Sequence, residues 1–163
     1  MGTSRWMLAA LAACGGSAPS EYVARDPCTP LEVTVNAATA GERDGIAAAV
    51  ALWRVRGVSA FDAAPASEAA TDAPAARIEI RFDEAAATFH GVFDPAADRV
   101  VINRDLADPA TLAIVIAHEL GHVFGLVHVA PATRLSLMNP GNLVMPPTDD
   151  DQRALAALWG ACR

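Results

Sequence analysis

The sequence predicts a single α+β domain, and three observations support that fold class. The chain has 163 residues, which suits one domain and leaves no room for a second. Short segments that alternate apolar and polar residues indicate strands, and a longer segment with apolar residues every three or four positions indicates an amphipathic helix. Segments of both kinds are interspersed along the chain, so helices and strands are expected to pack in layers around one core.

Five short segments are expected to form strands. Residues 77–82 alternate most clearly, because their three apolar residues would face one way and their charged residues the other. Residues 88–93 and 99–103 are separated by a segment whose composition is typical of a turn. The other two expected strands are residues 31–35 and 57–61.

Three segments are expected to form helices. In residues 41–56 the apolar positions recur at helical spacing. A second helix is expected from Pro109 to about residue 124, because proline suits the first helical position and Asp108 can cap it. A third is expected to begin near Thr148, whose hydroxyl can act as the cap, and to end at residues 159–160.

Composition excludes two classes of function. The net charge is -7, and all 12 basic residues are arginines scattered along the chain, whereas a nucleic-acid-binding protein needs a basic stripe. The longest apolar runs, residues 6–14 and 112–117, are too short to span a membrane as a helix. We therefore expect no nucleic-acid partner and no membrane association except through a lipid anchor.

The amino end has the features of a targeting segment. In residues 1–13, Arg5 precedes a short apolar stretch that ends in small residues. The sequence Leu-Ala-Ala-Cys that ends at Cys14 resembles the lipobox of bacterial lipoproteins, in which the chain is cut before an acylated cysteine. The resemblance implies an exported protein that is lipid-anchored in the bacterial cell envelope. The alternatives are an ordinary signal peptide of a secreted protein and a short helix. Residues 14–27 are interpreted as a tether and residues 28–163 as the folded domain.

The three cysteines divide naturally if Cys14 carries a lipid. Cys28 and Cys162 then remain, one at each end of the folded domain. An exported chain meets an oxidising compartment, so these two residues are expected to form a disulfide. The alternative is that Cys28 is an inhibitory thiolate ligand to a metal.

One motif in the second half predicts a metal site. His118 and His122 are four residues apart, so on a helix both imidazoles point to one side and can bind a single cation, with Glu119 beside them. Gly125 can end this helix and turn the chain back, so that His128 supplies a third nitrogen. Three imidazoles with an open fourth position are the ligand set of catalytic zinc. One Zn²⁺ ion is therefore the expected cofactor.

The motif resembles that of the metzincin clan of zinc endopeptidases, and its matrixin-like branch in particular. The sequence Ser-Leu-Met-Asn-Pro around Met138 is similar to the clan's methionine-containing turn, which lies under the metal. This resemblance implies a zincin-like fold, with a twisted mixed sheet of five strands and three helices. It also implies that Met138 packs below the metal, that an extended peptide adds to the edge strand at Gly91 and Val92, and that Pro140 walls the pocket beyond the scissile bond.

Some residues depart from the family pattern. Met138 lies ten residues past His128, slightly further than in matrixins, so the loop between them is extended. Asn139 stands where relatives often have tyrosine, and Val127 stands where a polar residue is usual. No tyrosine is therefore expected at the metal.

The expected function is that of a zinc-dependent endopeptidase acting on a peptide or protein substrate, with a monomeric chain. Glu119 is expected to be the general base for a metal-activated water. Three alternatives remain: a non-catalytic zinc-binding surface lipoprotein, a peptidase-like module whose cleft is blocked by residues 62–76, and an aminopeptidase. The carboxylates of residues 149–151 either bind calcium or stabilise the start of the last helix.

Overall fold

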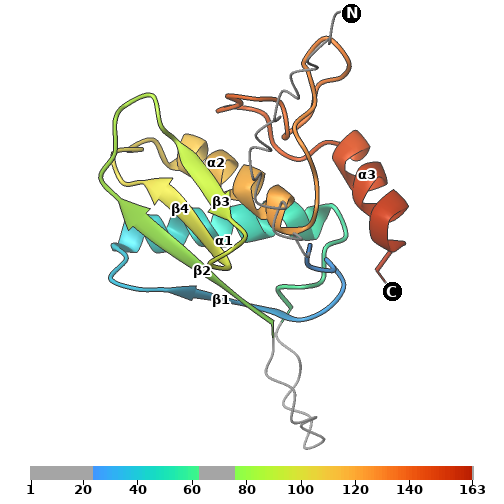
Figure 1. Ribbon diagram of the computed structural model, residues 1–163, viewed down its shortest axis with the longest axis horizontal. Coiled ribbons are helices and arrows are strands. Elements are labelled where there is room, and N and C mark those ends of the chain that lie inside the picture. The colour runs from blue at the N-terminus through green and yellow to red at the C-terminus, as the bar shows by residue number, and fades with distance from the viewer. Residues whose placement is uncertain (1–23, 63–75, 163) are drawn as a thin grey trace, which may run out of the picture.

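The computed structural model describes residues 24–62 and 76–162, and within them the chain has an α+β fold (Figure 1). The expected signal peptide (residues 1–13), Cys14 and most of the tether lie outside the described residues, as do residues 63–75. Three helices and four strands are present among the described residues. In order they are β1 (Leu31–Val35), α1 (Ala40–Val55), β2 (Ala76–Asp83), β3 (Gly91–Asp94), β4 (Arg99–Asn103), α2 (Pro109–Val123) and α3 (Asp149–Trp159).

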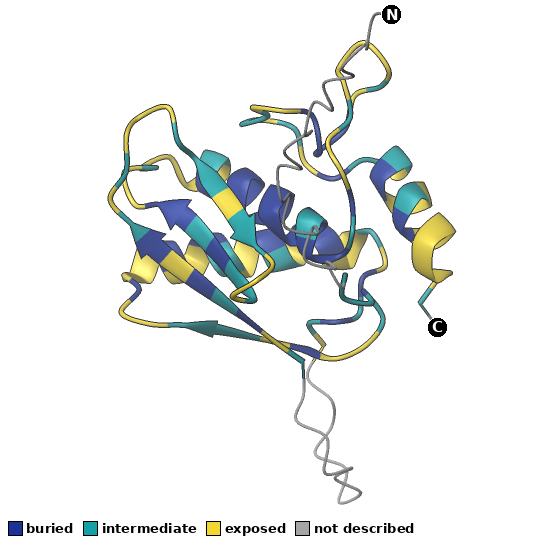
Figure 2. Cartoon of the chain, viewed as in Figure 1, coloured by how far each residue is buried: buried dark blue, intermediate teal, exposed yellow. Residues whose placement is uncertain are grey.

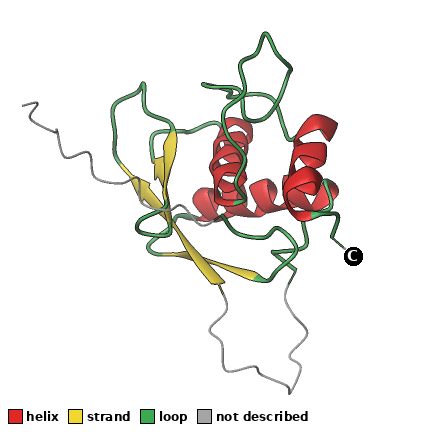
Figure 3. Ribbon diagram, turned by 45° about the vertical axis from the view of Figure 1, so that its right-hand side comes forward, coloured by secondary structure: helices red, strands yellow, loops and turns green. Residues whose placement is uncertain are grey.

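The four strands form one mixed sheet in the order β1-β2-β4-β3. β1, β2 and β4 run parallel, and β3 pairs antiparallel with β4, which makes β3 one edge of the sheet. The alternation predicted for β2 is confirmed, because Ile78, Ile80 and Phe82 are buried. The helices lie together on one side of the sheet (Figure 3).

The sheet differs from the expected five strands at residues 57–61, where the described part of the chain has no strand. The backbone N–H groups of residues 58–60 bond to partners outside the sheet. Val58 N–H donates to the carbonyl of Trp53 at the end of α1, and the N–H groups of Ser59 and Ala60 both donate to the carbonyl of Pro27. Only one bond, from Leu31 N–H to the carbonyl of Ala60, links this segment to β1. No regular ladder can form with these groups already engaged.

The edge strand is also shorter than expected. Residues 88–93 were expected to be extended, but β3 begins at Gly91 and ends at Asp94. The side chain of Asn103 explains the difference, because its amide donates to the carbonyls of Ala86 and Phe89. These bonds hold residues 86–89 in a turn in place of a ladder.

The core lies between the sheet and the helix pair α1–α2 (Figure 2). Trp53 of α1 is fully buried, and its indole N–H donates to the carbonyl of Ala117 of α2 at 2.9 Å. α2 is buried along most of its length, as Figure 2 shows by its dark blue colour. No helix among the described residues has the length and apolar character needed to cross a bilayer.

The two ends of the described chain are joined to the domain. Cys28 and Cys162 form a disulfide that connects residues 134 positions apart. Close to it, Arg25 N–H donates to the carbonyl of Val123 at the end of α2, and the Arg25 side chain pairs with Asp98. The segment before Cys28 therefore packs against the end of α2, although residues 14–27 were interpreted as a tether.

We expect removal of the disulfide to destabilise the domain. The bond closes a loop that spans nearly the whole described chain, so the double variant Cys28→Ser, Cys162→Ser should lose about 2–5 kcal/mol of unfolding free energy. Urea unfolding followed by tryptophan fluorescence measures this change. Equal urea midpoints for the oxidised wild type and the double variant would contradict the prediction.

Candidate metal centre

Helix α2 positions the first two histidines. It begins with Asp108, whose carboxylate accepts from Thr111 N–H, followed by Pro109 at the first helical position. Its run of buried residues fixes the rotation of the helix against the core. His118 and His122, one turn apart, consequently face the same side, and their rings lie 5.0 Å apart between centroids.

A glycine turn brings the third histidine back to the helix. Gly125 has a positive φ of 93°, which glycine adopts readily. Its N–H donates to the carbonyl of His122, and Leu126 N–H donates to the carbonyl of Gly121, which is the Schellman arrangement that ends helices. The chain then reverses, and the ring of His128 lies 4.7 Å from that of His122 between centroids. The prediction that Gly125 ends the helix is confirmed.

The three imidazoles converge through their Nε2 atoms. Nε2 of His128 lies 3.1 Å from Nε2 of His118 and 3.3 Å from Nε2 of His122. Nitrogens that share a tetrahedral zinc ion with bonds of about 2.0–2.1 Å stand about 3.3 Å apart, so these separations fit a common cation. The three residues are the one group of three or more metal-ligating side chains that the described part of the chain brings together. His118, His122 and His128 could hold a metal ion.

Two backbone carbonyls fix the tautomers that leave these nitrogens available. Nδ1 of His118 lies 2.8 Å from the carbonyl oxygen of Leu137, and Nδ1 of His122 lies 2.8 Å from that of Leu126. A carbonyl oxygen only accepts, so both Nδ1 atoms carry the proton and both Nε2 atoms present lone pairs. A single proton on His128 cannot satisfy two acceptor nitrogens, whereas one cation satisfies all three. The donor set therefore fits a metal.

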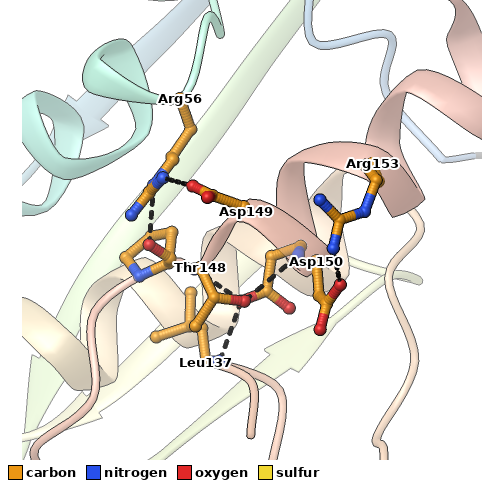
Figure 4. A network of polar contacts seen from close by, with 8 residues as sticks. Arg56, Leu137, Thr148, Asp149, Asp150 and Arg153 are labelled. Atoms are coloured by element: carbon orange, nitrogen blue, oxygen red, sulfur yellow. Dashed lines mark hydrogen bonds and ion pairs between the residues drawn. The ribbon is translucent and has the colours of Figure 1, made fainter. Parts of the chain in front are cut away.

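The turn that contains Met138 supports His118 from below. Leu137 N–H donates to the carboxylate of Asp151, which is fully buried and also accepts from Ser136 and from Thr148 at the start of α3. Figure 4 shows Thr148 and Leu137 in this network, with the pairs Arg56–Asp149 and Arg153–Asp150 beside it. The start of α3 thus holds the carbonyl that orients His118.

Met138 itself packs under α2. It is fully buried, and a side chain at Gly121 would meet its sulfur at 2.6 Å and its methyl group at 3.3 Å. Asn139 ties this turn to the loop after the third histidine, since its amide donates to the carbonyls of Val129 and Arg134. The residue that stands where relatives often have tyrosine therefore closes the extended loop.

Glu119 lies between the histidines and the edge strand. Its side chain is buried, and its carboxylate accepts a hydrogen bond from the backbone N–H of Phe93 in β3. Burial raises the pKa of Glu119 to about 7, with the Phe93 bond acting in the opposite direction. Burial also lowers the pKa of His118 to about 4 and lowers that of His122. The site therefore favours neutral imidazoles and a carboxyl group that exchanges its proton near neutrality.

A cleft of about 540 Å³ opens in front of this group. The expected substrate-binding residues Gly91, Val92 and Pro140 all line it, together with the three histidines and Glu119. His90 also lines the cleft. The apolar part of the lining is formed by Phe89, Val92, Phe93, Pro95, Val115, Leu126, Val127, Pro140 and Leu143.

Sequence reasoning missed the residues that support the site. Asp151 was grouped with residues 149–151 as a charge cluster, yet its carboxylate is buried and holds the Met138 turn. Asn142 was not singled out, although its amide donates to the same Leu137 carbonyl that accepts from His118. Phe93 acts through its backbone, which no side-chain pattern reveals. Residues 149–151 do not form a metal-ligating group among the described residues.

The sequence matches no model of a protein family and no curated protein.

We expect a side chain at Gly121 to disturb the support of the centre. The variant Gly121→Ala places its Cβ against Met138 and within 3.3 Å of the ring of Trp53, both fully buried. The unfolding free energy should fall by about 1–3 kcal/mol, as in overpacked cores, and metal affinity should weaken. Urea unfolding and competition with a metal-binding dye measure the two effects.

Gly41→Ala is the matched control, because a Cβ at that helical position meets no atom within 4 Å. An equal effect of the two variants on metal affinity would contradict the prediction for Gly121.

The stability of the metal-free protein should depend on pH through groups with opposite effects. His118 acts in one direction, together with His122, whose pKa is also lowered, and Glu119 acts in the other. The pKa of His118 is lowered from 6.5 to about 4, so its contribution is present above pH 6.5 and is lost as the pH falls towards 4. The pKa of Glu119 is raised from 4.5 to about 7, so its contribution is present below pH 4.5 and is lost as the pH rises through 7.

Glu119→Gln removes only the second contribution. Between pH 5 and 6.5 the variant's stability should therefore rise more steeply with pH than that of the wild type. Urea midpoints measured in a chelating buffer across this range test the prediction, which parallel curves for the two proteins would refute.

Proposed function

We propose that the protein is a zinc-dependent endopeptidase of the metzincin type. The observation that carries the proposal is the convergence of three Nε2 atoms beside a buried carboxylate, in a cleft bordered by a sheet edge. A purely structural zinc site closes its coordination with four protein ligands, whereas this group supplies three. The turn around Met138 and the glycine turn at Gly125 add to the resemblance to that clan.

The three histidines and Glu119 would have separate roles in hydrolysis. His118, His122 and His128 would hold zinc, which when bound acidifies a water molecule and polarises a carbonyl. Glu119 would accept the proton of the attacking water at its carboxylate and pass it to the leaving amine. In the metal-free chain burial raises the pKa of Glu119 to about 7, so this carboxyl group can take up and release a proton near neutral pH, as a general base does.

The substrate would bind as an extended strand along β3. β3 is an edge strand, and Gly91, Val92 and Pro140 line the cleft beside the histidines. Addition of a strand provides backbone hydrogen bonds from any peptide, and the apolar lining then selects side chains. A cleft open at both ends would favour cleavage within chains over trimming of their ends.

The cell-envelope location belongs to the same proposal. Its support is the lipobox-like sequence that ends at Cys14, which lies outside the described residues. The disulfide between Cys28 and Cys162 is compatible with this location, because such bonds persist in oxidising compartments. A non-catalytic zinc-binding lipoprotein is the second candidate, although metal capture alone gives no reason for a buried carboxylate beside the ligands.

The variant Glu119→Gln distinguishes the two candidates. It should bind zinc with an affinity near that of the wild type and lose peptide cleavage by a factor of about 10²–10⁴, because the proton acceptor is gone while the imidazoles remain. Cleavage of a mixed peptide library, with and without a chelator, measures activity and metal dependence together.

Glu79→Gln is the matched control, since Glu79 lies on β2, is not among the residues that line the cleft, and accepts a solvent-exposed hydrogen bond from Asn36. Wild-type cleavage rates in Glu119→Gln would exclude this residue as the base. A zinc-loaded wild type that cleaves no peptide would refute the endopeptidase and favour the non-catalytic zinc-binding lipoprotein.

A further inference from the structure

β3 approaches α2 so closely at Gly91 that even a methyl side chain would crowd the helix. A Cβ at this position would lie 3.1 Å from Cδ1 of Ile102, 3.1 Å from Cγ1 of Val115 and 3.2 Å from Cγ of Glu119. Ile102 is fully buried, and Val115 and Glu119 are 3% and 6% exposed, so none of the three can move far. A side chain at position 91 would therefore push β3 and α2 apart by a few tenths of an ångström, whereas glycine leaves them in close contact.

The close approach brings a backbone amide to Glu119. Asn103 N–H donates to the carbonyl of His90, so residues 90, 92 and 94 form the ladder bonds with β4, while Gly91 and Phe93 direct their backbone groups to the open edge. The N–H of Phe93 therefore points away from β4, and it donates to the Glu119 carboxylate. Gly91 and Phe93 thus contribute differently. Gly91 permits the close approach of β3 to α2, and Phe93 provides the amide that reaches Glu119.

We propose that Gly91 and the main-chain amide of Phe93 are positioning groups for Glu119. Gly91 sets the distance between β3 and α2, and the Phe93 amide fixes one carboxylate oxygen, so that the other oxygen is directed to the reacting water. This inference rests on the proposed function in so far as it assigns Glu119 a proton transfer, whereas the hydrogen bond itself is a property of the metal-free chain.

The arrangement also limits how a substrate can pair with the edge. The Phe93 amide is already engaged with Glu119, so an extended peptide cannot use it as a donor. Pairing would centre on the backbone groups of Gly91, which face the same edge two residues earlier. Val92 and His90 lie on either side of Gly91 and line the cleft there.

Amide hydrogen exchange tests the hydrogen bond without any measurement of activity. In the metal-free wild type the Phe93 amide should be protected although it points away from β4, and in Glu119→Ala it should exchange about tenfold faster or more. Glu119→Gln should retain the protection, because its side-chain oxygen still accepts. The Gly91 amide, which faces the same edge, is the internal control and should not change. Unchanged exchange of Phe93 in Glu119→Ala overturns the proposal.

Turnover tests the positioning role. Gly91→Ala should displace Glu119 by a few tenths of an ångström and lower kcat about tenfold, while KM and zinc affinity stay within about twofold of the wild type. Gly41→Ala, with open space around its Cβ, should leave all three quantities unchanged.

The outcomes separate the two proposals. An unchanged kcat in Gly91→Ala, or a loss confined to KM or to zinc affinity, overturns the positioning role while the peptidase assignment stands. A wild type without peptidase activity refutes the proposed function, and the exchange experiment then still decides whether Phe93 holds the carboxylate.

Discussion

The metal centre depends on two hydrogen bonds from imidazole to backbone. The carbonyls of Leu137 and Leu126 each accept from an Nδ1 atom, of His118 and His122 respectively, at 2.8 Å. Without them either ring could turn or change tautomer, and its Nε2 atom would no longer be a fixed lone pair. Both acceptors lie on loops, so the geometry of the site depends on whatever holds those loops in place.

The two loops are held by different means. Leu126 follows the glycine turn that ends α2, so its carbonyl is fixed by the helix that carries the histidines. Leu137 is held through its N–H by Asp151, which stands in the first turn of α3. The other end of α3 is attached as well, since Trp159 donates to the carbonyl of Phe124 and Cys162 is bonded to Cys28. α3 is therefore attached at both ends, through Asp151 to the Met138 turn and through Trp159 and the disulfide to the rest of the domain.

Side-chain patterns predicted the helices correctly. The strand at residues 57–61 and the supports of the site depend instead on backbone hydrogen bonds that only the fold brings together. The amphipathic period of α1, the proline start of α2 and the threonine cap of α3 are local signals, and all three helices form where they indicate. The strand expected at residues 57–61 does not form, because its backbone groups bond to Pro27 and Trp53. These contacts depend on the tertiary fold and not on local propensity. For the same reason the spacing of His118, His122 and His128 predicted a metal group, while nothing in the sequence assigned Leu137, Asp151 and Phe93 their supporting roles.

The supports of Glu119 and of the histidines come from opposite sides of α2. β3 approaches from one side and places an amide on the carboxylate, while the Met138 turn packs below Gly121 and orients His118. Both contacts use a glycine. A Cβ at position 121 on the helix would lie 2.6 Å from the sulfur of Met138, and one at position 91 on the strand would lie 3.1 Å from its nearest buried neighbours. The carboxylate and the imidazoles can therefore be held rigidly relative to one another although only the helix is common to them. The geometry of this site therefore depends on two glycines that lie beside the metal ligands and Glu119, as well as on the ligands themselves.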